Sequence, residues 1–153
     1  MKLSIPGLGK VELKTVILDL NGTLSLRGKL VEGVQERLVL LKKKGFEIFL
    51  FSGDTRGNSK EVAQSLEIKL VVASSGKEKM LAAKKLYPET CVAIGNGLID
   101  VPLFKVVRLS IATLQSEGAH TKCLQASEIV VPSVLDALDL LIDEPSLIAT
   151  LRS

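Results

Sequence analysis

Asp19 is the residue of this chain best placed for chemistry. It follows the apolar run Val16-Ile17-Leu18 and opens the segment Asp19-Leu20-Asn21-Gly22-Thr23-Leu24. The apolar run predicts a buried strand, and ligands of open α/β sheets bind at the carboxyl ends of strands. An aspartate there can act as a nucleophile or ligate a metal ion. An Asn-Gly hairpin turn is the alternative for these six residues alone.

Polar residues follow four predicted strands and together would supply carboxylates, amides, a hydroxyl and an ammonium group. In chain order they are Asp19 and Asn21, Ser52 and Asp54, Lys79, and Asn96 with Asp100. This set suits Mg²⁺ bound together with phosphate, because Mg²⁺ takes a few hard oxygen ligands and leaves positions for water and substrate. A hydroxyl, backbone N–H groups and a lysine can hold phosphate oxygens.

The elements that must position these residues alternate between apolar strands and amphipathic helices. The predicted strands are Thr15–Leu20, Glu47–Phe51, Ile68–Val72, Cys91–Ile94, Leu109–Ile111 and Ile129–Val131. The first predicted helix has Val34, Leu38 and Leu41 on one face and stops at Gly45, and the second is Asn58–Leu66. A third helix begins at a capping box formed by Ser75 and Glu78 and runs to Leu86. A short helix near Pro102 and a helix that begins at Ser133 complete the set. A short segment begins at Pro145. Apolar strands separated by helices predict a doubly wound α/β domain with a parallel sheet covered on both faces.

Two hairpins are predicted outside this alternation. Leu3–Ile5 and Val11–Leu13 flank Pro6-Gly7-Leu8-Gly9 and form a small N-terminal hairpin, and Leu24–Leu30 forms a second just after Asp19. No linker, repeat or low-complexity stretch divides the chain, so residues 1–153 are expected to form a single domain.

Composition excludes several classes of function. The hydrophobic fraction is 46% and the charged fraction 24%, as in ordinary globular proteins. With 3% aromatic residues and a net charge of +3, no nucleic-acid partner is expected. No membrane association and a cytoplasmic location are expected, because the chain has no signal peptide and no long apolar run. Cys91 and Cys123 lack metal-ligand spacing, and His120 has no triad partner, so it is given a structural role.

Four motifs in order resemble those of the haloacid dehalogenase superfamily of aspartate-nucleophile phosphotransferases. They are Asp19-Leu20-Asn21-Gly22-Thr23-Leu24, Ser52-Gly53-Asp54, Lys79 before Met80-Leu81, and Gly95-Asn96-Gly97-Leu98-Ile99-Asp100. The resemblance extends from about Thr15 to about Leu141 and is greatest to uncapped, soluble P-type-ATPase-like hydrolases. It implies a Mg²⁺-dependent phosphohydrolase or phosphotransferase that acts through an aspartyl-phosphate on Asp19.

The resemblance also implies roles for the other motif residues. Mg²⁺ would be held by Asp19, the Asn21 carbonyl and Asp100, with Asn96 close by. Ser52, Gly53 and Lys79 would hold the phosphoryl group, and Thr23 would brace the loop. Alternatives stay open for several: Lys77 competes with Lys79, Asn96 is also a plausible turn residue, Ser52 a plausible helix cap, and Asp54 is expected to support its loop.

Two departures from the family pattern shape the expected activity. Most family phosphatases carry a general acid–base aspartate at the position of Asn21, and an amide cannot shuttle a proton. Hydrolysis is therefore expected to be slow, and acyl or aryl phosphates to react best. The connections after the first motif and between the second and third motifs are also too short for a cap domain. The site is therefore expected to be open, and either the phosphorylated substrate is bulky or a neighbouring copy of the chain covers the site.

A catalytically weak phosphoryl-receiver or binding module is the alternative function. Other nucleotide and receiver folds have less support. A CheY-like receiver needs an acidic pair before Asp19, and Gly76-Lys77-Glu78 lacks the Ser or Thr of a P-loop.

Overall fold

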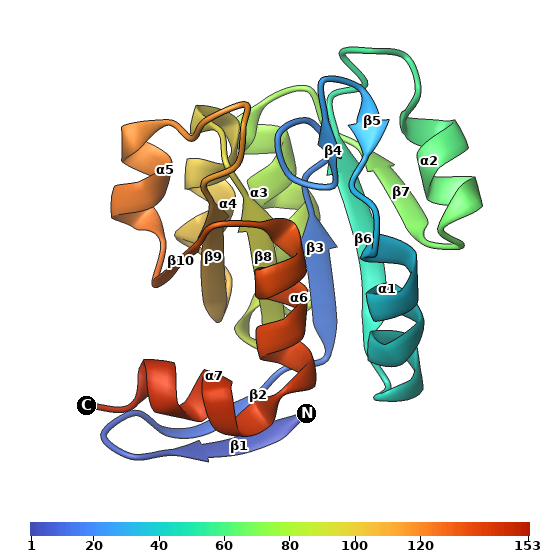
Figure 1. Ribbon diagram of the computed structural model, residues 1–153. Helices are drawn as coiled ribbons and strands as arrows, with labels where there is room; N and C mark the ends of the chain where they lie inside the picture. The colour runs from blue at the N-terminus through green and yellow to red at the C-terminus, as the bar shows by residue number, and fades with distance from the viewer.

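A six-stranded, wholly parallel sheet forms the centre of the computed structural model, which describes residues 1–153 (Figure 1). The spatial order of the strands is β10-β9-β8-β3-β6-β7. Their bounds are β3 (Thr15–Leu18), β6 (Glu47–Ser52), β7 (Lys69–Val72), β8 (Cys91–Gly95), β9 (Leu109–Thr113) and β10 (Ile129–Val131). The sheet grows outward in both directions from β3, which confirms the predicted doubly wound α/β fold.

Three neighbouring strands of the sheet, β3, β8 and β9, are buried along their whole length. Such burial is expected for strands covered on both faces. The sheet places the carboxyl ends of β3, β6 and β8 side by side, because β3 pairs in parallel register with both neighbours. The loops that follow these strands therefore meet at one edge of the sheet.

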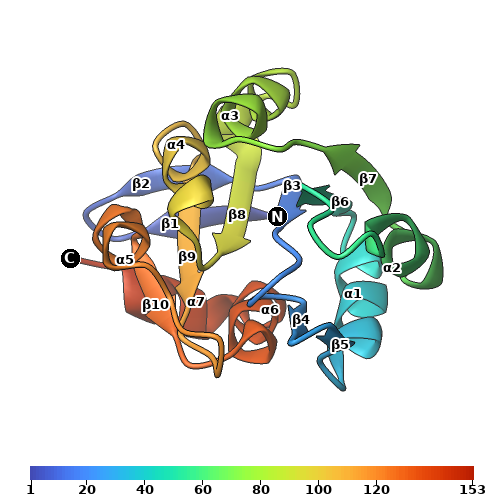
Figure 2. The same ribbon diagram turned by 90° about the horizontal axis from the view of Figure 1, so that it is seen from above.

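Helices cover both faces of the sheet, and the sheet separates the core into two apolar clusters. The helices are α1 (Val34–Lys43), α2 (Ser59–Ser65), α3 (Gly76–Lys84), α4 (Val101–Phe104), α5 (Thr121–Ala126), α6 (Val134–Ile142) and α7 (Glu144–Leu151), with short 3-10 turns at Pro88–Thr90 and Leu98–Asp100. Residues of α1, α2, α6 and α7 pack in one cluster, and those of α3, α4 and α5 in the other. Figure 2 shows the two groups on opposite sides of the sheet. No helix is long and apolar enough to span a bilayer.

Helix α3 begins at a cap that differs slightly from the predicted one. The Glu78 N–H donates to the Ser75 hydroxyl at 3.2 Å, as expected. The Glu78 carboxylate, however, accepts from the N–H of Ser74 rather than from that of Ser75. The cap therefore also fixes the residue before the helix, which lies in the loop after β7.

The two predicted hairpins lie at opposite ends of the sheet. The N-terminal one, β1 (Lys2–Ile5) with β2 (Gly9–Glu12), packs beside α7 at the amino ends of the strands (Figure 1). The second, β4 (Ser25–Leu26) with β5 (Lys29–Leu30), lies at the carboxyl ends. Its central residues Arg27 and Gly28 have φ angles of 50° and 83°, the backbone of a type I′ turn.

Candidate active site

The loops that follow β3, β6, β7 and β8 enclose a cavity of about 240 Å³. Its lining residues are Asp19, Asn21, Ser52, Gly53, Thr55, Ser74, Lys79, Asn96, Gly97 and Ile99. The family resemblance assigns seven residues to catalysis, phosphate binding or metal binding; six of them line this cavity, and Asp100, the seventh, is fully buried behind it. Asp54, which also follows β6, does not line the cavity.

Lys79 joins the two carboxylates of the site. Its Nζ lies 2.7 Å from Asp19 Oδ1 and 2.7 Å from Asp100 Oδ1, and its side chain is only 1% exposed. Burial lowers the pKa of Lys79, but the charges of Asp19 and Asp100 outweigh it, so the pKa is raised overall. Lys79 therefore stays a cation inside the protein. Lys77 is exposed and does not line this cavity.

Asp19 is the carboxylate that faces the cavity, and its pKa is shifted upward. Burial is the main cause and the nearby charge of Asp100 adds to it, which together raise the pKa of Asp19 to about 7 despite the opposing charge of Lys79. A second cation beside Asp19 would favour the ionised form. The site is thus short of positive charge when only Lys79 is present.

Asp100 is held by backbone N–H groups as well as by Lys79. Its Oδ2 accepts hydrogen bonds from the N–H groups of Asn96 at 3.1 Å and Gly97 at 3.0 Å. This geometry requires glycine at position 95, because a Cβ there would overlap the Asp100 carboxylate. Backbone N–H groups of the glycine-rich motif after β8 therefore hold the aspartate of the same motif in place.

Asn96 braces the loop after β3. Its Oδ1 accepts from the Thr23 hydroxyl at 3.3 Å, and its Nδ2 donates to the carbonyl oxygen of Gly118 at 3.0 Å. Gly22 has a φ of 79°, and a Cβ on it would overlap the Asn96 amide. Both polar atoms of that amide are thus engaged by the protein, and Thr23 takes the bracing position predicted for it.

Gln115 is a supporting residue that the sequence did not reveal. Its Nε2 donates to the carbonyl oxygens of Gly22 at 3.0 Å and Thr23 at 2.9 Å, and its Oε1 accepts from the N–H of Val134. Gln115 therefore connects the loop after β3 to the start of α6. No local motif marks Gln115, because Gly22 and Thr23, whose carbonyl groups it binds, lie more than 90 residues earlier in the chain.

Ser52 and Asp54 take different roles at the end of β6. The Ser52 hydroxyl accepts from the N–H of Asp54 at 3.0 Å, and it donates to no protein acceptor. The Asp54 carboxylate accepts from the hydroxyl of Ser59 at 2.7 Å and from its N–H at 3.0 Å, and these hydrogen bonds lower the pKa of Asp54. Asp54 thus supports its loop, while the Ser52 hydroxyl keeps a donor for a ligand.

Asn21 offers two oxygen atoms that no protein donor satisfies. Its side-chain Oδ1 is buried without a hydrogen-bond partner. Its carbonyl oxygen accepts none of the backbone hydrogen bonds of this loop, where Ser25 instead pairs with Leu20 and Gly22. A buried acceptor without a partner costs about 1–3 kcal/mol, and a bound group that satisfied the Asn21 oxygens would recover this cost.

The single histidine and the two cysteines stand apart from this chemistry. His120 Nδ1 accepts from the N–H of Lys122 at 3.1 Å and caps α5, which agrees with its predicted structural role. Burial raises the pKa of Cys91 to about 11 and that of Cys123 to about 12. Both thiols are therefore protonated near neutral pH.

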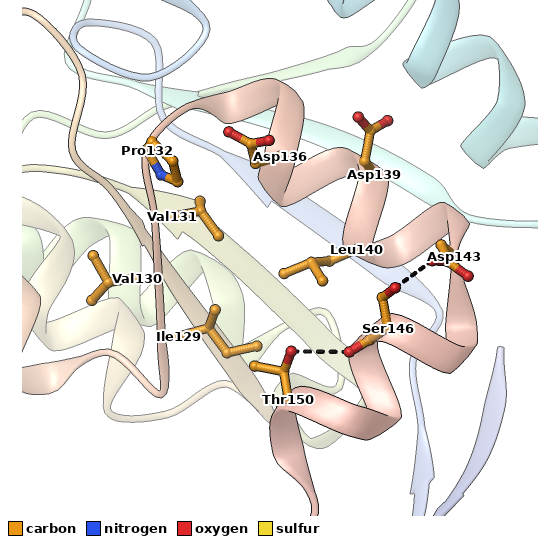
Figure 3. A pocket seen from close by; sticks show the side chains of 10 residues that line it. All are labelled: Ile129, Val130, Val131, Pro132, Asp136, Asp139, Leu140, Asp143, Ser146 and Thr150. Carbon is orange, nitrogen blue, oxygen red and sulfur yellow. Dashed lines mark hydrogen bonds between the residues drawn. The ribbon is translucent and has the colours of Figure 1, made fainter.

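A separate cavity of about 370 Å³ lies between β10 and the helices α6 and α7 (Figure 3). Its three carboxylates are already engaged: Asp136 with the Ser133 hydroxyl, Asp139 with Arg37 and Asp143 with the Ser146 hydroxyl. It has no residue in common with the cavity at Asp19.

Comparison with known proteins gives matches over most of the chain. Residues 13–108 match the haloacid dehalogenase-like hydrolase family. A soluble P-type ATPase-like phosphatase of Methanocaldococcus jannaschii is 26% identical over 123 residues, which are 77% of this chain and 45% of that protein. A copper-transporting ATPase of Helicobacter pylori is 29% identical over 130 residues, or 80% of this chain and 17% of the transporter. The chain thus spans less than half the length of these two curated relatives.

The fold also occurs among solved structures. A 3-deoxy-D-manno-octulosonate 8-phosphate phosphatase from Moraxella catarrhalis, crystallised in complex with a magnesium ion, a phosphate ion and a KDO molecule, superposes with a TM-score of 0.69. The match covers 92% of this chain and 94% of that one at 17% sequence identity. At this identity the likeness shows a common fold.

Proposed function

Because the chain belongs to the haloacid dehalogenase-like hydrolase family, as its motifs predicted, we propose that it is a phosphatase that uses Asp19 as nucleophile. The observation that carries the proposal is the arrangement around Asp19. Its carboxylate faces a cavity that Lys79 and Ser52 also line, and the Lys79 ammonium group is held by Asp100 as well as by Asp19. A nucleophile, a buried cation and a free donor thus meet where a phosphoryl group would bind.

The reaction has two steps on Asp19. In the first, a carboxylate oxygen of Asp19 forms a bond to phosphorus, and the bond from phosphorus to the leaving oxygen breaks with its electron pair kept by that oxygen. In the second, water attacks phosphorus, the bond to Asp19 breaks, and inorganic phosphate leaves while a proton passes to solvent. Lys79 and Ser52 hold the phosphoryl oxygens through both steps.

The residues present fit a magnesium ion. Asp19 would supply a carboxylate oxygen, Asn21 a carbonyl oxygen that accepts no hydrogen bond, and Asp100 a buried carboxylate that shares the Lys79 ammonium group with Asp19. These are the hard oxygen ligands that Mg²⁺ prefers, and a set of two carboxylates leaves positions for water and phosphate. When bound, the ion would supply positive charge to the phosphoryl oxygens. Asn96 would act through the loop that it braces, since its amide atoms are occupied.

Asn21 limits the rate of the reaction. It occupies the position from which a general acid would protonate the leaving oxygen, and its amide N–H groups can donate hydrogen bonds but are too weakly acidic to transfer a proton. Loss of such a group typically costs about 10²- to 10⁴-fold in rate. Substrates with good leaving groups, such as acyl and aryl phosphates, are therefore hydrolysed faster than alkyl phosphates.

The first experiment is phosphate release from phenyl phosphate and acetyl phosphate, with and without Mg²⁺, by the natural protein and by Asp19→Asn. Asn has nearly the shape of Asp, so circular dichroism should show the same fold while activity is lost. Incubation with ³²P-labelled acetyl phosphate should leave acid-stable, hydroxylamine-labile label on the natural protein only. Label without release would support the alternative of a phosphoryl receiver, and neither label nor release would contradict both functions.

A further inference from the structure

A second, more open groove of about 680 Å³ adjoins the cavity at Asp19. Ser74 and Ile99 line both hollows, so the groove begins where the cavity at Asp19 ends. The groove lies between the start of α3 and the segment that leads into α4, at the carboxyl ends of β7 and β8. A molecule with its phosphoryl group at Asp19 could therefore extend into this groove.

The charge of the groove has one sign. Lys77, Lys105 and Lys122 line it, and no acidic residue does. All three lysines are exposed, and none takes part in an ion pair or donates a side-chain hydrogen bond within the protein. The carboxylate at the start of α3, that of Glu78, is held on the Ser74 N–H.

The cavity beside β10 provides a contrast within the same molecule. Figure 3 shows the three aspartates that line it. Each of them forms a hydrogen bond or an ion pair with a serine or an arginine. The groove beside the active site instead gathers three ammonium groups that lack partners. Like charges brought together in a concave surface repel one another, and a bound anion would relieve that repulsion.

We propose that this groove binds the leaving group of the substrate, and that the leaving group carries at least one further phosphate or carboxylate. The inference rests on the proposed function, because it assigns the groove to the part of the substrate that departs from phosphorus. A groove of this size accommodates a small molecule. Lys77, which the sequence analysis weighed as a catalytic lysine, becomes a determinant of specificity.

The absence of a general acid gives the groove a chemical purpose. With Asn21 at the acid position, the leaving oxygen departs as an anion. Lysines beside an already anionic leaving group reduce the cost of adding this charge, because opposite charges attract. The groove thus favours substrates whose leaving group can depart without being protonated.

The test compares two aryl phosphates that differ in one anionic group. Phenyl phosphate and 4-carboxyphenyl phosphate bind the same way at Asp19, but only the second places a carboxylate in the groove. The natural protein should have a kcat/KM about tenfold higher for the carboxylated compound, and added KCl should reduce the preference because salt screens exposed charges. Equal values of kcat/KM for the two compounds would overturn the proposal.

Two triple variants separate the groove from general surface charge. Lys77→Ala/Lys105→Ala/Lys122→Ala should lower the ratio of the two kcat/KM values to about one. The control Lys10→Ala/Lys43→Ala/Lys84→Ala removes the same charge from exposed lysines outside the groove and should keep the preference. Loss of the preference in both triple variants would attribute it to net charge and contradict the groove.

Binding without turnover keeps this test apart from that of the proposed function. Isothermal titration with methylenediphosphonate in metal-free buffer should show binding about tenfold weaker in the groove variant than in the control variant. Equal affinities of the two variants for methylenediphosphonate would overturn the proposed role of the groove, even if the protein is an active phosphatase. Turnover of pyrophosphate against propane-1,3-diyl bisphosphate then distinguishes a phosphoanhydride substrate from a bisphosphate ester.

Discussion

At the scale of single residues, position 21 has an amide where the proposed reaction would use a carboxyl group as its general acid. Asn21→Asp replaces an amide by a carboxyl group of nearly the same shape, in a loop where the Asn21 Oδ1 has no partner. The exchange restores a proton donor and should raise kcat for an alkyl phosphate such as ethyl phosphate by about 10²-fold. The measurement is steady-state phosphate release.

Acetyl phosphate provides the internal control for Asn21→Asp, because its leaving group needs little protonation. Its rate should change much less than that of ethyl phosphate. Asp19→Asn/Asn21→Asp should be inactive if the new carboxyl works only through Asp19. An unchanged rate for ethyl phosphate would show that protonation of the leaving group does not limit the natural protein.

Asp19 makes the stability of the metal-free protein depend on pH. Its pKa is about 7 in the folded protein, against about 3.9 for an unperturbed aspartate. The folded state thus binds the proton more tightly, so the contribution of Asp19 to stability is full below about pH 4 and is lost as the pH rises towards 7. Asp19→Asn removes this loss and should be more stable than the natural protein at pH 8, by a margin that shrinks towards pH 4. Urea unfolding in EDTA measures it.

Asp54 gives the opposite dependence and serves as the comparison. Hydrogen bonds from Ser59 lower its pKa, so its contribution is present above the unfolded value and is lost as the pH falls through the folded one. Asp54→Asn should therefore be less stable than the natural protein at pH 8, by a margin that shrinks towards pH 3. The same pH dependence for both variants would contradict this assignment of the two carboxylates.

At the scale of elements, the turn from β8 to the 3-10 segment shows how a motif depends on backbone space. Gly95 ends β8, and a Cβ at this position would overlap the carboxylate of Asp100. Gly95→Ala should displace that carboxylate from Lys79 and the two N–H groups, and destabilise the protein by about 2–4 kcal/mol. Chemical denaturation measures the change, and Mg²⁺-dependent activity should fall with it.

Gly97→Ala is the matched control for this prediction. Gly97 has a φ of −104°, and the nearest atom to an added Cβ would be 3.5 Å away, which is ordinary contact. Its N–H would still bond to Asp100 after the exchange. Equal destabilisation by the two alanines would mean that chain entropy, rather than space for Asp100, explains the glycines of this motif.

Local elements also show where sequence reasoning failed. Helix α5 was not predicted, because Thr121–Ala126 is short and buries only one of its residues, so it presents no apolar period. The predicted capping box at Ser75 was half right, since the Glu78 carboxylate bonds to Ser74 instead. Side chains at a helix start choose between adjacent N–H groups by tertiary geometry, which residue spacing does not encode.

At the scale of the whole molecule, the strand ends were predictable because parallel pairing is set by unbroken apolar runs. This pairing places Asp19, Ser52, Lys79 and Asp100 together, as their positions after strands implied. The supports of the site were not predictable in the same way. Gln115 reaches the loop after β3 across the sheet, and nothing in its neighbours indicates that contact. Reactive residues at strand ends can thus be recognised from the local sequence, whereas the residues that brace their loops can be recognised only in the completed fold.

The molecule also separates the site from much of its stabilising core. The site lies at the carboxyl ends of the strands, and α7 packs with the N-terminal hairpin at the amino ends (Figure 1). Leu147 of α7 is fully buried in the core cluster that includes Leu3, Ile5 and Val11. Leu147→Ala leaves a cavity there and should lower the free energy of unfolding by about 2–5 kcal/mol. Urea unfolding gives this value.

The activity of the remaining folded Leu147→Ala protein tests the separation itself. Because no residue of α7 contacts the cavity at Asp19, kcat and KM for phenyl phosphate should equal those of the natural protein below the unfolding transition. Leu8→Ala is the control for stability, since Leu8 lies in the same hairpin region but is 43% exposed and should cost little. A change in KM with the fold intact would show that packing at the amino ends reaches the site through β3, so that core and site are coupled across the sheet.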